Sequence, residues 1–368
     1  MRKRNTRQAR NTNNDLRYAI CDTAYHMNIL VCSPQVPFAR GGAEMLAEGL
    51  CDALNRAGHC AELARLPFQW QPHAQLFQSA LAWRLLDLTR ANGVKIDRLI
   101  ATKFPSYAAR HPHKIVWLVH QYRQAYDWYG TSFSEFTSAP EDRATREKLF
   151  ALDRRTLGEA RARFAISKNV AARLKRFNAL EATPLYPPPR LTGKFFADAY
   201  DDYILYVGRL DRAKRIDLLL RALAKTKRGR VLIAGAGAEE QSLKRLAQSL
   251  NIASRVAFAG FVDDARVLDL YARARAVFYA PVDEDYGFAT VEALMSARPV
   301  ITTDDAGGVL EFIENENDGW VTRADENEIA HALARALDDA ELCRALGERG
   351  RERVREISWD TVVNALTA

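Results

Sequence analysis

The sequence predicts an α/β protein of two domains, each built on a parallel sheet with helices on both faces. Short apolar strands alternate with stretches of helical periodicity from residue 28 onward, which is the pattern of a parallel sheet. Prolines at residues 187–189 interrupt this alternation, and a second alternating segment follows them. The length of 368 residues is enough for two domains of about 150 residues each.

These breaks divide the chain into five parts. We expect a disordered basic tail, a first domain, a proline linker, a second domain and a last helix that packs back on the first domain, at residues 1–26, 27–186, 187–190, 191–355 and 356–368. The tail carries Arg2, Arg4 and Arg7 among polar residues, and no apolar stretch of a signal peptide follows. Met27 directly precedes the first strand, so either the folded domain or translation itself can begin there.

In the first half, a glycine pair follows the first strand. Strands are predicted at residues 28–32, 60–64, 96–101 and 114–119, and helices at residues 43–57 and 74–91. Gly41 and Gly42 lie between the first strand and the first helix, where missing side chains let a backbone approach a phosphate. The same pair is also typical of an ordinary turn.

His120 closes the apolar strand 114–119, at the end where open α/β sheets bind ligands. A neutral imidazole at this position can bond a hydroxyl or assist a proton transfer, although a histidine that merely caps a strand fits the pattern as well. The next loop contains Tyr122, Tyr126, Trp128 and Tyr129, which form either a platform for a sugar ring or part of the core.

Positive charge is concentrated in one segment. The chain has 53 Lys and Arg against 46 Asp and Glu, a net charge of +7. Residues 153–177 contain eight cations and only Asp153 and Glu159 as acids, so they account for most of this excess. The segment is a candidate surface for anionic lipid or another polyanion, and a solvated helix face explains it equally well.

In the second half, a strand at residues 203–207 leads into a turn with two cations. Arg209 and Lys214 are five residues apart across this strand-to-helix turn, and both can reach a phosphate at the helix start. The alternative is a pair of surface cations. The following strand ends at Gly235 and Gly237, but Glu240 stands where a dinucleotide fingerprint has its third glycine, so we expect no nicotinamide site.

The most informative stretch covers residues 278–308. It predicts a strand, an acidic loop, a helix at residues 287–297 and a further strand. Glu284 precedes the helix and Glu292 lies about one turn inside it, so both can face the crevice at the carboxyl edge of the sheet. Two carboxylates beside a helix N-terminus suit a sugar nucleotide, whereas acids near a helix start are common for other reasons too.

Cysteine usage and hydropathy limit the compartment. The five cysteines show no C-x-x-C spacing, which indicates reduced thiols in a cytoplasmic protein rather than a disulfide framework or a zinc site. No apolar run reaches the roughly 20 residues of a membrane-spanning helix. Any membrane contact is therefore expected to be peripheral, on the inner face.

Five ordered motifs of the second half resemble the retaining GT-B glycosyltransferases of family 4, also known as glycosyl transferases group 1. They are VGRLDRAKRIDLLLRA at 207–222, IAGAGAEEQSL at 233–243, FAGFV at 258–262, the E-x7-E element EDYGFATVE at 284–292 and ARPVITTDDAGGVLEFI at 297–313. In the first half ARGGAE at 39–44, His120 and SKNVAARL at 167–174 also fit, more thinly. The resemblance implies two Rossmann-like domains that face each other across a cleft.

The resemblance also implies roles for individual residues. Arg209 and Lys214 would hold the donor diphosphate, Glu292 the ribose and Glu284 the sugar ring, with His120 near the donor hydroxymethyl group. The remaining donor contacts would come from the base pocket, the phosphate cradle and the opposite domain, at Gly260, Phe261 and Val262, at Gly287, Phe288, Ala289 and Thr290, and at Gly41 and Gly42.

The implied reaction needs neither metal nor cofactor, because a donor phosphate oxygen takes the acceptor proton. Asp283 and Asp285 spell D-x-D, the metal element of another glycosyltransferase fold, but here we interpret it as coincidental. The expected partners are a nucleotide-sugar donor, a glycan or lipid-linked acceptor of the surface-polysaccharide type and an anionic membrane surface, with no nucleic acid. The alternatives are a nucleotide-sugar epimerase or hydrolase on the same scaffold and a basic nucleic-acid-binding protein.

Overall fold

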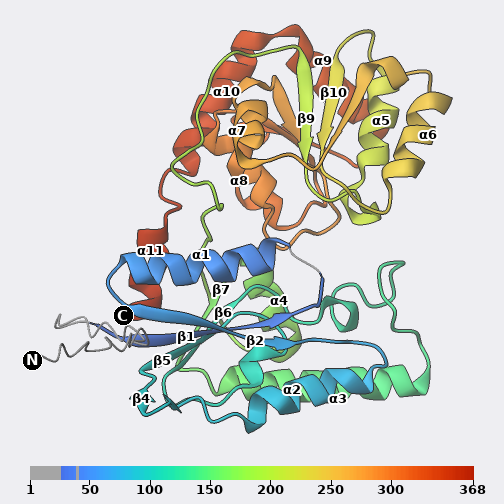
Figure 1. The fold of residues 1–368 in the computed structure, drawn as a ribbon. Helices are drawn as coiled ribbons and strands as arrows, with labels where there is room; N and C mark the ends of the chain where they lie inside the picture. The colour runs from blue at the N-terminus through green and yellow to red at the C-terminus, as the bar shows by residue number, and fades with distance from the viewer. Residues whose placement is uncertain (1–25, 39–40) are drawn as a thin grey trace, which may run out of the picture.

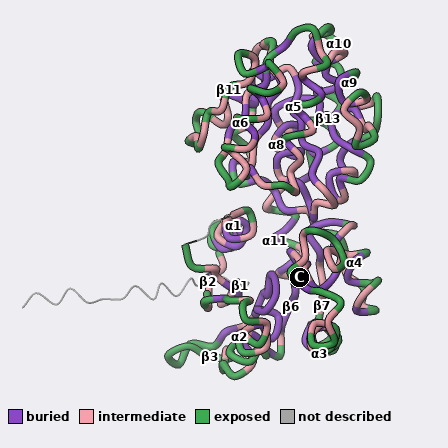
Figure 2. Tube along the Cα trace, turned by 90° about the vertical axis from the view of Figure 1, so that its right-hand side faces the viewer, coloured by how far each residue is buried: buried purple, intermediate pink, exposed green. Residues whose placement is uncertain are grey.

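The computed structural model describes residues 26–38 and 41–368 and confirms the prediction of two α/β domains (Figure 1). The expected disordered tail lies outside the described residues, except for His26. Each domain has a six-stranded sheet in which every neighbouring pair of strands is parallel. The buried segments of the chain run through the middle of both domains, and exposed segments lie at their periphery (Figure 2).

The first domain has the strand order β2-β1-β5-β6-β7-β8. Its strands are β1 (Asn28–Gln35), β2 (Cys60–Pro67), β5 (Arg98–Ala101), β6 (Lys114–Leu118), β7 (Ala162–Ala165) and β8 (Thr183–Pro184). Its helices are α1 (Gly42–Arg56), α2 (Ala74–Leu85), α3 (Pro140–Gly158) and α4 (Lys168–Asn178). Helix α1 follows the predicted apolar periodicity and buries Leu46, Leu50 and Leu54 at intervals of four residues.

Two features of this domain differ from the prediction. The helix expected to reach residue 91 ends at Leu85, and a short hairpin of β3 (Arg90–Ala91) and β4 (Val94–Lys95) follows. The hairpin forms because Asn92 and Gly93 both adopt positive φ, as a tight two-residue turn requires. Helix α3 was not predicted, because its many charged residues hide the apolar positions that face the core, and strand β7 was not predicted, because it has only four residues.

The second domain has the strand order β11-β10-β9-β12-β13-β14. Its strands are β9 (Tyr203–Val207), β10 (Arg230–Ala234), β11 (Val256–Gly260), β12 (Ala276–Phe278), β13 (Val300–Thr303) and β14 (Gly319–Thr322). Its helices are α5 (Ile216–Lys225), α6 (Glu240–Ser249), α7 (Asp264–Arg273), α8 (Phe288–Met295), α9 (Glu326–Asp338) and α10 (Ala340–Arg353). Strand β14 at the edge of the sheet is an addition to the predicted elements.

The last helix, α11 (Trp359–Thr367), lies against the first domain beside α1 (Figure 1). The Trp359 and Trp117 rings meet edge to face, with their centroids 6.4 Å apart. A Cβ at Gly49 would lie 2.7 Å from the Trp359 ring, so α1 packs closely against it. The Arg98 guanidinium donates a 2.6 Å hydrogen bond to the Leu366 carbonyl. The chain thus crosses between the domains twice, once at residues 187–190 and once after α10.

Asp153 is fully buried in the core of the first domain, although the sequence places it in the cationic segment. Its Oδ2 accepts a 2.6 Å hydrogen bond from the Tyr126 hydroxyl, which in turn accepts one from the Asn178 amide at 3.2 Å. Oδ1 accepts no hydrogen bond of ordinary geometry within the described residues, although the Tyr107 hydroxyl lies close enough to lower the pKa of the carboxyl. Burial raises the pKa of Asp153 to about 7, and the Tyr126 hydrogen bond offsets only part of this effect.

This buried carboxyl predicts a pH-dependent stability. The folded protein binds the Asp153 proton more tightly than the unfolded chain does, so the free energy of unfolding falls as the pH rises from about 4 to 7. We expect the free energy of unfolding of Asp153→Asn, relative to that of the wild type, to rise by about 2 kcal/mol between about pH 5.5 and pH 8 in urea unfolding. Parallel pH profiles of the two proteins would contradict the assignment.

Candidate active site

The two domains meet through segments that each follow the carboxyl end of a strand. Gly42 comes after β1, Arg123 after β6 and Ser167 after β7, and all three face the loop at residues 281–287 after β12 or the helix that follows it. Ligands of open α/β sheets bind at this edge. The geometry therefore places the candidate site between the two sheets.

Close backbone packing builds the floor of the site in the second domain. Gly235 has a φ of 145°, and a Cβ there would lie 1.8 Å from the Gly208 carbonyl oxygen. The turn after β10 therefore packs directly against the turn after β9, which only glycine permits. Because this contact fixes the turn after β9, it also fixes the start of the segment that leads to Lys214.

Lys214 and Glu284 form the centre of the site. The Lys214 ammonium donates to the Glu284 carboxylate and, at 3.2 Å, to the Tyr279 hydroxyl. The same hydroxyl donates to Glu284 at 3.4 Å. Backbone bonds hold Glu284 in place, since its N–H donates to the Ala306 carbonyl and its own carbonyl accepts from Gly308.

Glu292 projects from the second turn of α8 and lies deeper. Its Oε2 accepts a 2.9 Å hydrogen bond from the Tyr271 hydroxyl. Burial raises the pKa of Glu292, and the Tyr271 hydrogen bond and the charge of Arg190 offset this in part. Tyr271 thus holds Glu292, whereas Glu284 is held by Lys214 and Tyr279.

The Arg209 side chain points away from Lys214, and its predicted contact with a phosphate stays a prediction. It is 77% exposed and its nearest charged partner is Asp211, at 3.7 Å. The Arg209 carbonyl accepts a 2.8 Å bond from the buried Tyr206 hydroxyl, so the backbone is fixed while the guanidinium points to solvent.

The N-termini of α1 and α8 approach each other from opposite domains. A Cβ on Gly42 would lie 3.5 Å from the Phe288 ring, which stacks edge to face on Tyr286. At the start of α1 the Gly41 N–H donates to Glu44 Oε2 at 2.9 Å, and Lys103 holds the other carboxylate oxygen at 2.5 Å. The chain's own carboxylate therefore occupies the anion position beside Gly41.

The remaining residues expected around a donor lie along the same edge. Gly260 ends β11, and its carbonyl accepts from Gly235 at 2.8 Å. Phe261 is 90% exposed, and Val262 is partly buried against the core. Ala289 and Thr290 lie in the first turn of α8, where the buried Thr290 hydroxyl has no partner among the described residues.

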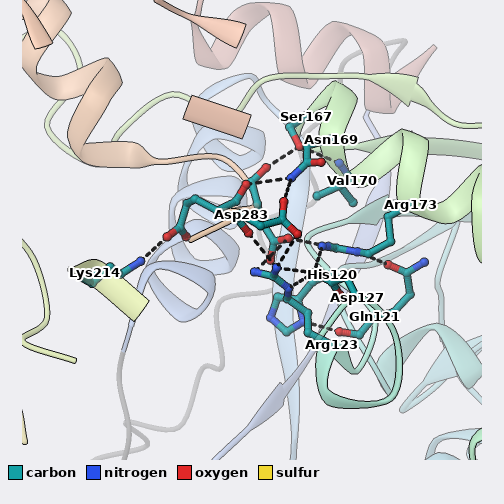
Figure 3. Close-up of polar contacts among 12 residues, drawn as sticks. His120, Gln121, Arg123, Asp127, Ser167, Asn169, Val170, Arg173, Lys214 and Asp283 are labelled. Carbon is teal, nitrogen blue, oxygen red and sulfur yellow. Dashed lines mark hydrogen bonds and ion pairs between the residues drawn. The ribbon is translucent and has the colours of Figure 1, made fainter. Parts of the chain in front are cut away.

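His120 follows β6 in the first domain, and Figure 3 shows it among Gln121, Arg123 and Asp127 of that domain. Its Nδ1 is 2.7 Å from the Gln121 carbonyl, so that nitrogen carries the hydrogen and a neutral ring keeps Nε2 as an acceptor. Burial lowers the pKa of His120, and the nearby charge of Asp285 opposes this. The ring is therefore neutral and able to accept a hydrogen bond.

The sequence reasoning missed a polar seam between the domains, made of Arg123, Asp127, Ser167, Asn169, Arg173, Asp283 and Asp285. Arg173, which was assigned to a surface patch, is buried and its Nη2 is 2.5 Å from Asp285. Asp283 and Asp285 pair with cations and an amide rather than with each other. The sequence did contain one signal for this seam. Asp283 and Asp285 need cationic partners if they are buried, and the cationic segment 153–177 could supply them.

The aromatic loop is largely core. Tyr122 and Tyr126 are buried, and Trp128 has the Arg123 guanidinium 4.4 Å above its ring. Within residues 26–38 and 41–368, no three or more His, Cys, Asp or Glu side chains are grouped to hold a metal ion. The helices in those residues are too short or too polar to cross a membrane.

Two parallel-sheet domains with the candidate site between their carboxyl edges define the GT-B fold. Sucrose-phosphate synthase from Thermosynechococcus elongatus has a similar structure, with a TM-score of 0.74 and 20% identity over 92% of this chain and 97% of that one. Anabaena HepE, solved with UDP-glucose, gives a TM-score of 0.67 and 16% identity over 93% of this chain and 98% of that one.

Sequence comparison matches the second domain to a known family. Residues 192–353 match the family model for glycosyl transferases group 1. D-inositol 3-phosphate glycosyltransferase of Mycolicibacterium smegmatis is 31% identical over 45% of this chain and 39% of its own length. A relative from Campylobacter jejuni, an N-acetylgalactosaminyltransferase whose name specifies a diphospho-undecaprenol-linked sugar, is 30% identical over 42% of each chain. The match spans about two fifths of these relatives.

The start of α8 depends on Gly287, which supplies a further prediction. Gly287 has a φ of 87°, and a Cβ would lie 2.7 Å from Val309 Cγ2. Gly193 has a similar φ of 85° with nothing within 4 Å of a Cβ. We expect Gly193→Ala to cost about 1 to 2 kcal/mol in urea unfolding and Gly287→Ala about twice as much. Equal losses would show that the contact with Val309 carries no weight.

Proposed function

We propose that this protein transfers a sugar from a nucleotide-sugar donor to a glycan or lipid-linked acceptor with retention of configuration. The observation that carries the proposal is the contact of Lys214, Glu284 and Tyr279 beside the N-terminus of α8. A cation, a carboxylate and free helix N–H groups at one point match the diphosphate and the hydroxyls of such a donor.

In the proposed complex the donor lies along the carboxyl edge of the second sheet. Lys214, the N–H groups of Phe288 and Ala289 and the Thr290 hydroxyl, unpaired among the described residues, hold the diphosphate, and the exposed Arg209 side chain swings in to join them. The Thr290 N–H instead donates to the Gly287 carbonyl. Glu292 accepts from the ribose hydroxyls, and Gly260, Phe261 and Val262 border the base. Glu284 leaves Lys214 to accept hydrogen bonds from the sugar.

The proposed chemistry needs no metal. The bond from the anomeric carbon to the phosphate oxygen breaks, and the acceptor oxygen bonds the same face of that carbon. The acceptor proton moves to a phosphate oxygen of the departing nucleotide. Lys214, Arg209 and the α8 dipole stabilise the charge that develops on this leaving group, and His120 contributes an acceptor near the sugar.

The comparisons support the substrate classes only by likeness. A similar structure contains UDP-glucose, which favours a nucleotide-sugar donor, and one relative is named for a diphospho-undecaprenol-linked substrate, which favours a lipid-linked acceptor. We infer a cytoplasmic enzyme of surface-polysaccharide type, whose acceptor is reached at the inner face of the membrane.

The donor site is tested by two substitutions. A thermal-shift screen of UDP-, GDP-, ADP- and dTDP-sugars identifies the donor, and transfer is then followed by product analysis with and without acceptor. We expect Lys214→Ala and Glu292→Ala each to lower kcat/KM by about 100-fold or more, with melting temperatures close to the wild type. EDTA should leave the wild-type rate unchanged.

Full activity of either variant would contradict the assigned roles. Sugar release that does not depend on an acceptor would instead point to a hydrolase on the same scaffold. Loss of activity in EDTA that Mg²⁺ restores would overturn the metal-independent chemistry.

Membrane attachment through residues 153–177 is a separate proposal. Arg154, Arg161 and Arg176 are exposed there, although Arg173 is not available. We expect the wild type to float with anionic liposomes and not with neutral ones, and Arg154→Glu with Arg176→Glu to reduce flotation several-fold. Arg221→Glu with Arg245→Glu, two exposed positions in the second domain, is the matched control. Equal flotation with both vesicle types would remove the proposal.

A further inference from the structure

The loop at residues 281–287 is held from two sides. The Glu284 side chain turns to Lys214 in the second domain, whereas its neighbours Asp283 and Asp285 turn to side chains of the first domain. Figure 3 shows Asp283 beside Asn169 of the first domain. A residue proposed to contact the donor sugar is therefore flanked by two residues that contact the opposite domain.

The main chain of this loop is gripped by side chains of the first domain. The carbonyls of Asp283, Glu284 and Asp285 accept hydrogen bonds from the Arg123 guanidinium at 2.7 Å, the Asn169 amide at 3.0 Å and the Ser167 hydroxyl at 2.5 Å, respectively. Three consecutive carbonyls are thus fixed relative to β6, β7 and the elements that follow them. The position of the Glu284 backbone depends directly on the first domain.

Ion pairs reinforce this grip. Arg173 Nη2 lies 2.5 Å from Asp285 Oδ1, and Arg123 Nη1 lies 3.5 Å from the same oxygen. Asp127 joins the two arginines from behind, since its Oδ2 accepts from Arg173 at 3.0 Å and from Arg123. Asp285 therefore pairs with both guanidinium groups, and Asp127 links the same two groups within the first domain.

The burial of these groups distinguishes the cluster from the surface ion pairs of the protein. The side chains of Arg173, Arg123 and Asp285 are 5%, 9% and 12% exposed, whereas those of the Arg228–Asp338 pair are 59% and 64% exposed. A buried ion pair fixes the relative position of its two side chains more strongly than an exposed pair does, because solvent screens the exposed pair. Burial alone would raise the pKa of Asp285, but the charges of Arg123 and Arg173 outweigh it and keep the carboxyl ionised.

We infer that Asp285 is a positioning residue, which through Arg173 and Arg123 sets the two domains against each other and places Glu284 opposite His120. The inference rests on the proposed glycosyl transfer and adds residues to it that do not touch the donor. The cluster acts through the loop backbone: when the pair is intact, the loop presents Glu284 and the start of α8 to the first domain at one fixed separation.

The variants for the test are Asp285→Asn, Arg173→Met, their double variant and Arg173→Lys. Asp285→Asn leaves Arg173 paired with Asp127, so the folded state keeps a partner for the buried cation. Asp338→Asn makes the same chemical change in an exposed Arg–Asp pair and is the matched control. Turnover, affinity for the nucleoside diphosphate and the radius of gyration from small-angle X-ray scattering are measured for each.

We expect Asp285→Asn to lower kcat by about 10- to 100-fold, because a displacement of about 1 Å between reacting groups has effects of that size. Nucleoside diphosphate affinity should change less than about threefold, since its proposed contacts lie in the second domain. The radius of gyration should increase. The double variant should be no slower than the slower single variant, because the residues act as one pair, and Arg173→Lys should recover part of the rate lost in Arg173→Met. Asp338→Asn should match the wild type.

A lower melting temperature with unchanged kcat and unchanged scattering would overturn the inference and leave the cluster as ordinary structural support. Rate losses that multiply in the double variant would overturn the pairing. The scattering measurement needs no activity, so it decides the positioning role even if the wild type transfers no sugar, an outcome that would refute the proposed function instead.

Discussion

The contact between the Lys214 ammonium and the Glu284 carboxylate is the interaction on which the candidate site depends. It joins the turn after β9 to the loop after β12, two segments that are 70 residues apart in the sequence. The Tyr279 hydroxyl contacts both side chains, and both charges are partly shielded from solvent. Each charge of the pair neutralises the other. A donor with a diphosphate and hydroxyl groups can replace both halves of the pair, since it offers an anion to the lysine and donors to the acid.

Charge is distributed differently on the two sides of the cleft. The second domain contributes a cation, two glutamates and a helix N-terminus, which are the groups for a donor. The first domain contributes guanidinium groups that are already saturated by aspartates, and a neutral His120. Its own helix start at Gly41 is capped by Glu44, which Lys103 holds in turn. An anion that is to reach Gly41 must therefore displace this carboxylate.

Much of the site could be predicted because strand ends are readable in the sequence. Lys214, Glu284 and His120 each follow an apolar strand, and a parallel sheet brings such ends to one edge. The orientation of Arg209 could not be read, because a five-residue spacing does not say which way a long side chain turns. The Arg123 and Arg173 contacts are set by the meeting of two domains, which leaves no periodicity in either segment. Helix α3 escaped prediction because charged residues cover most of its surface.

The second crossing of the chain, which carries α11 back to the first domain, limits how the halves of the molecule can move. A body attached to another at one point can tilt and swivel freely. Attachment at two points leaves rotation about the line that joins them. Trp359, anchored against Trp117 and Gly49, secures the second of these points. A rotation about that line would separate the loop at residues 281–287 from Arg123 and Arg173, and it would break the hydrogen bonds between them.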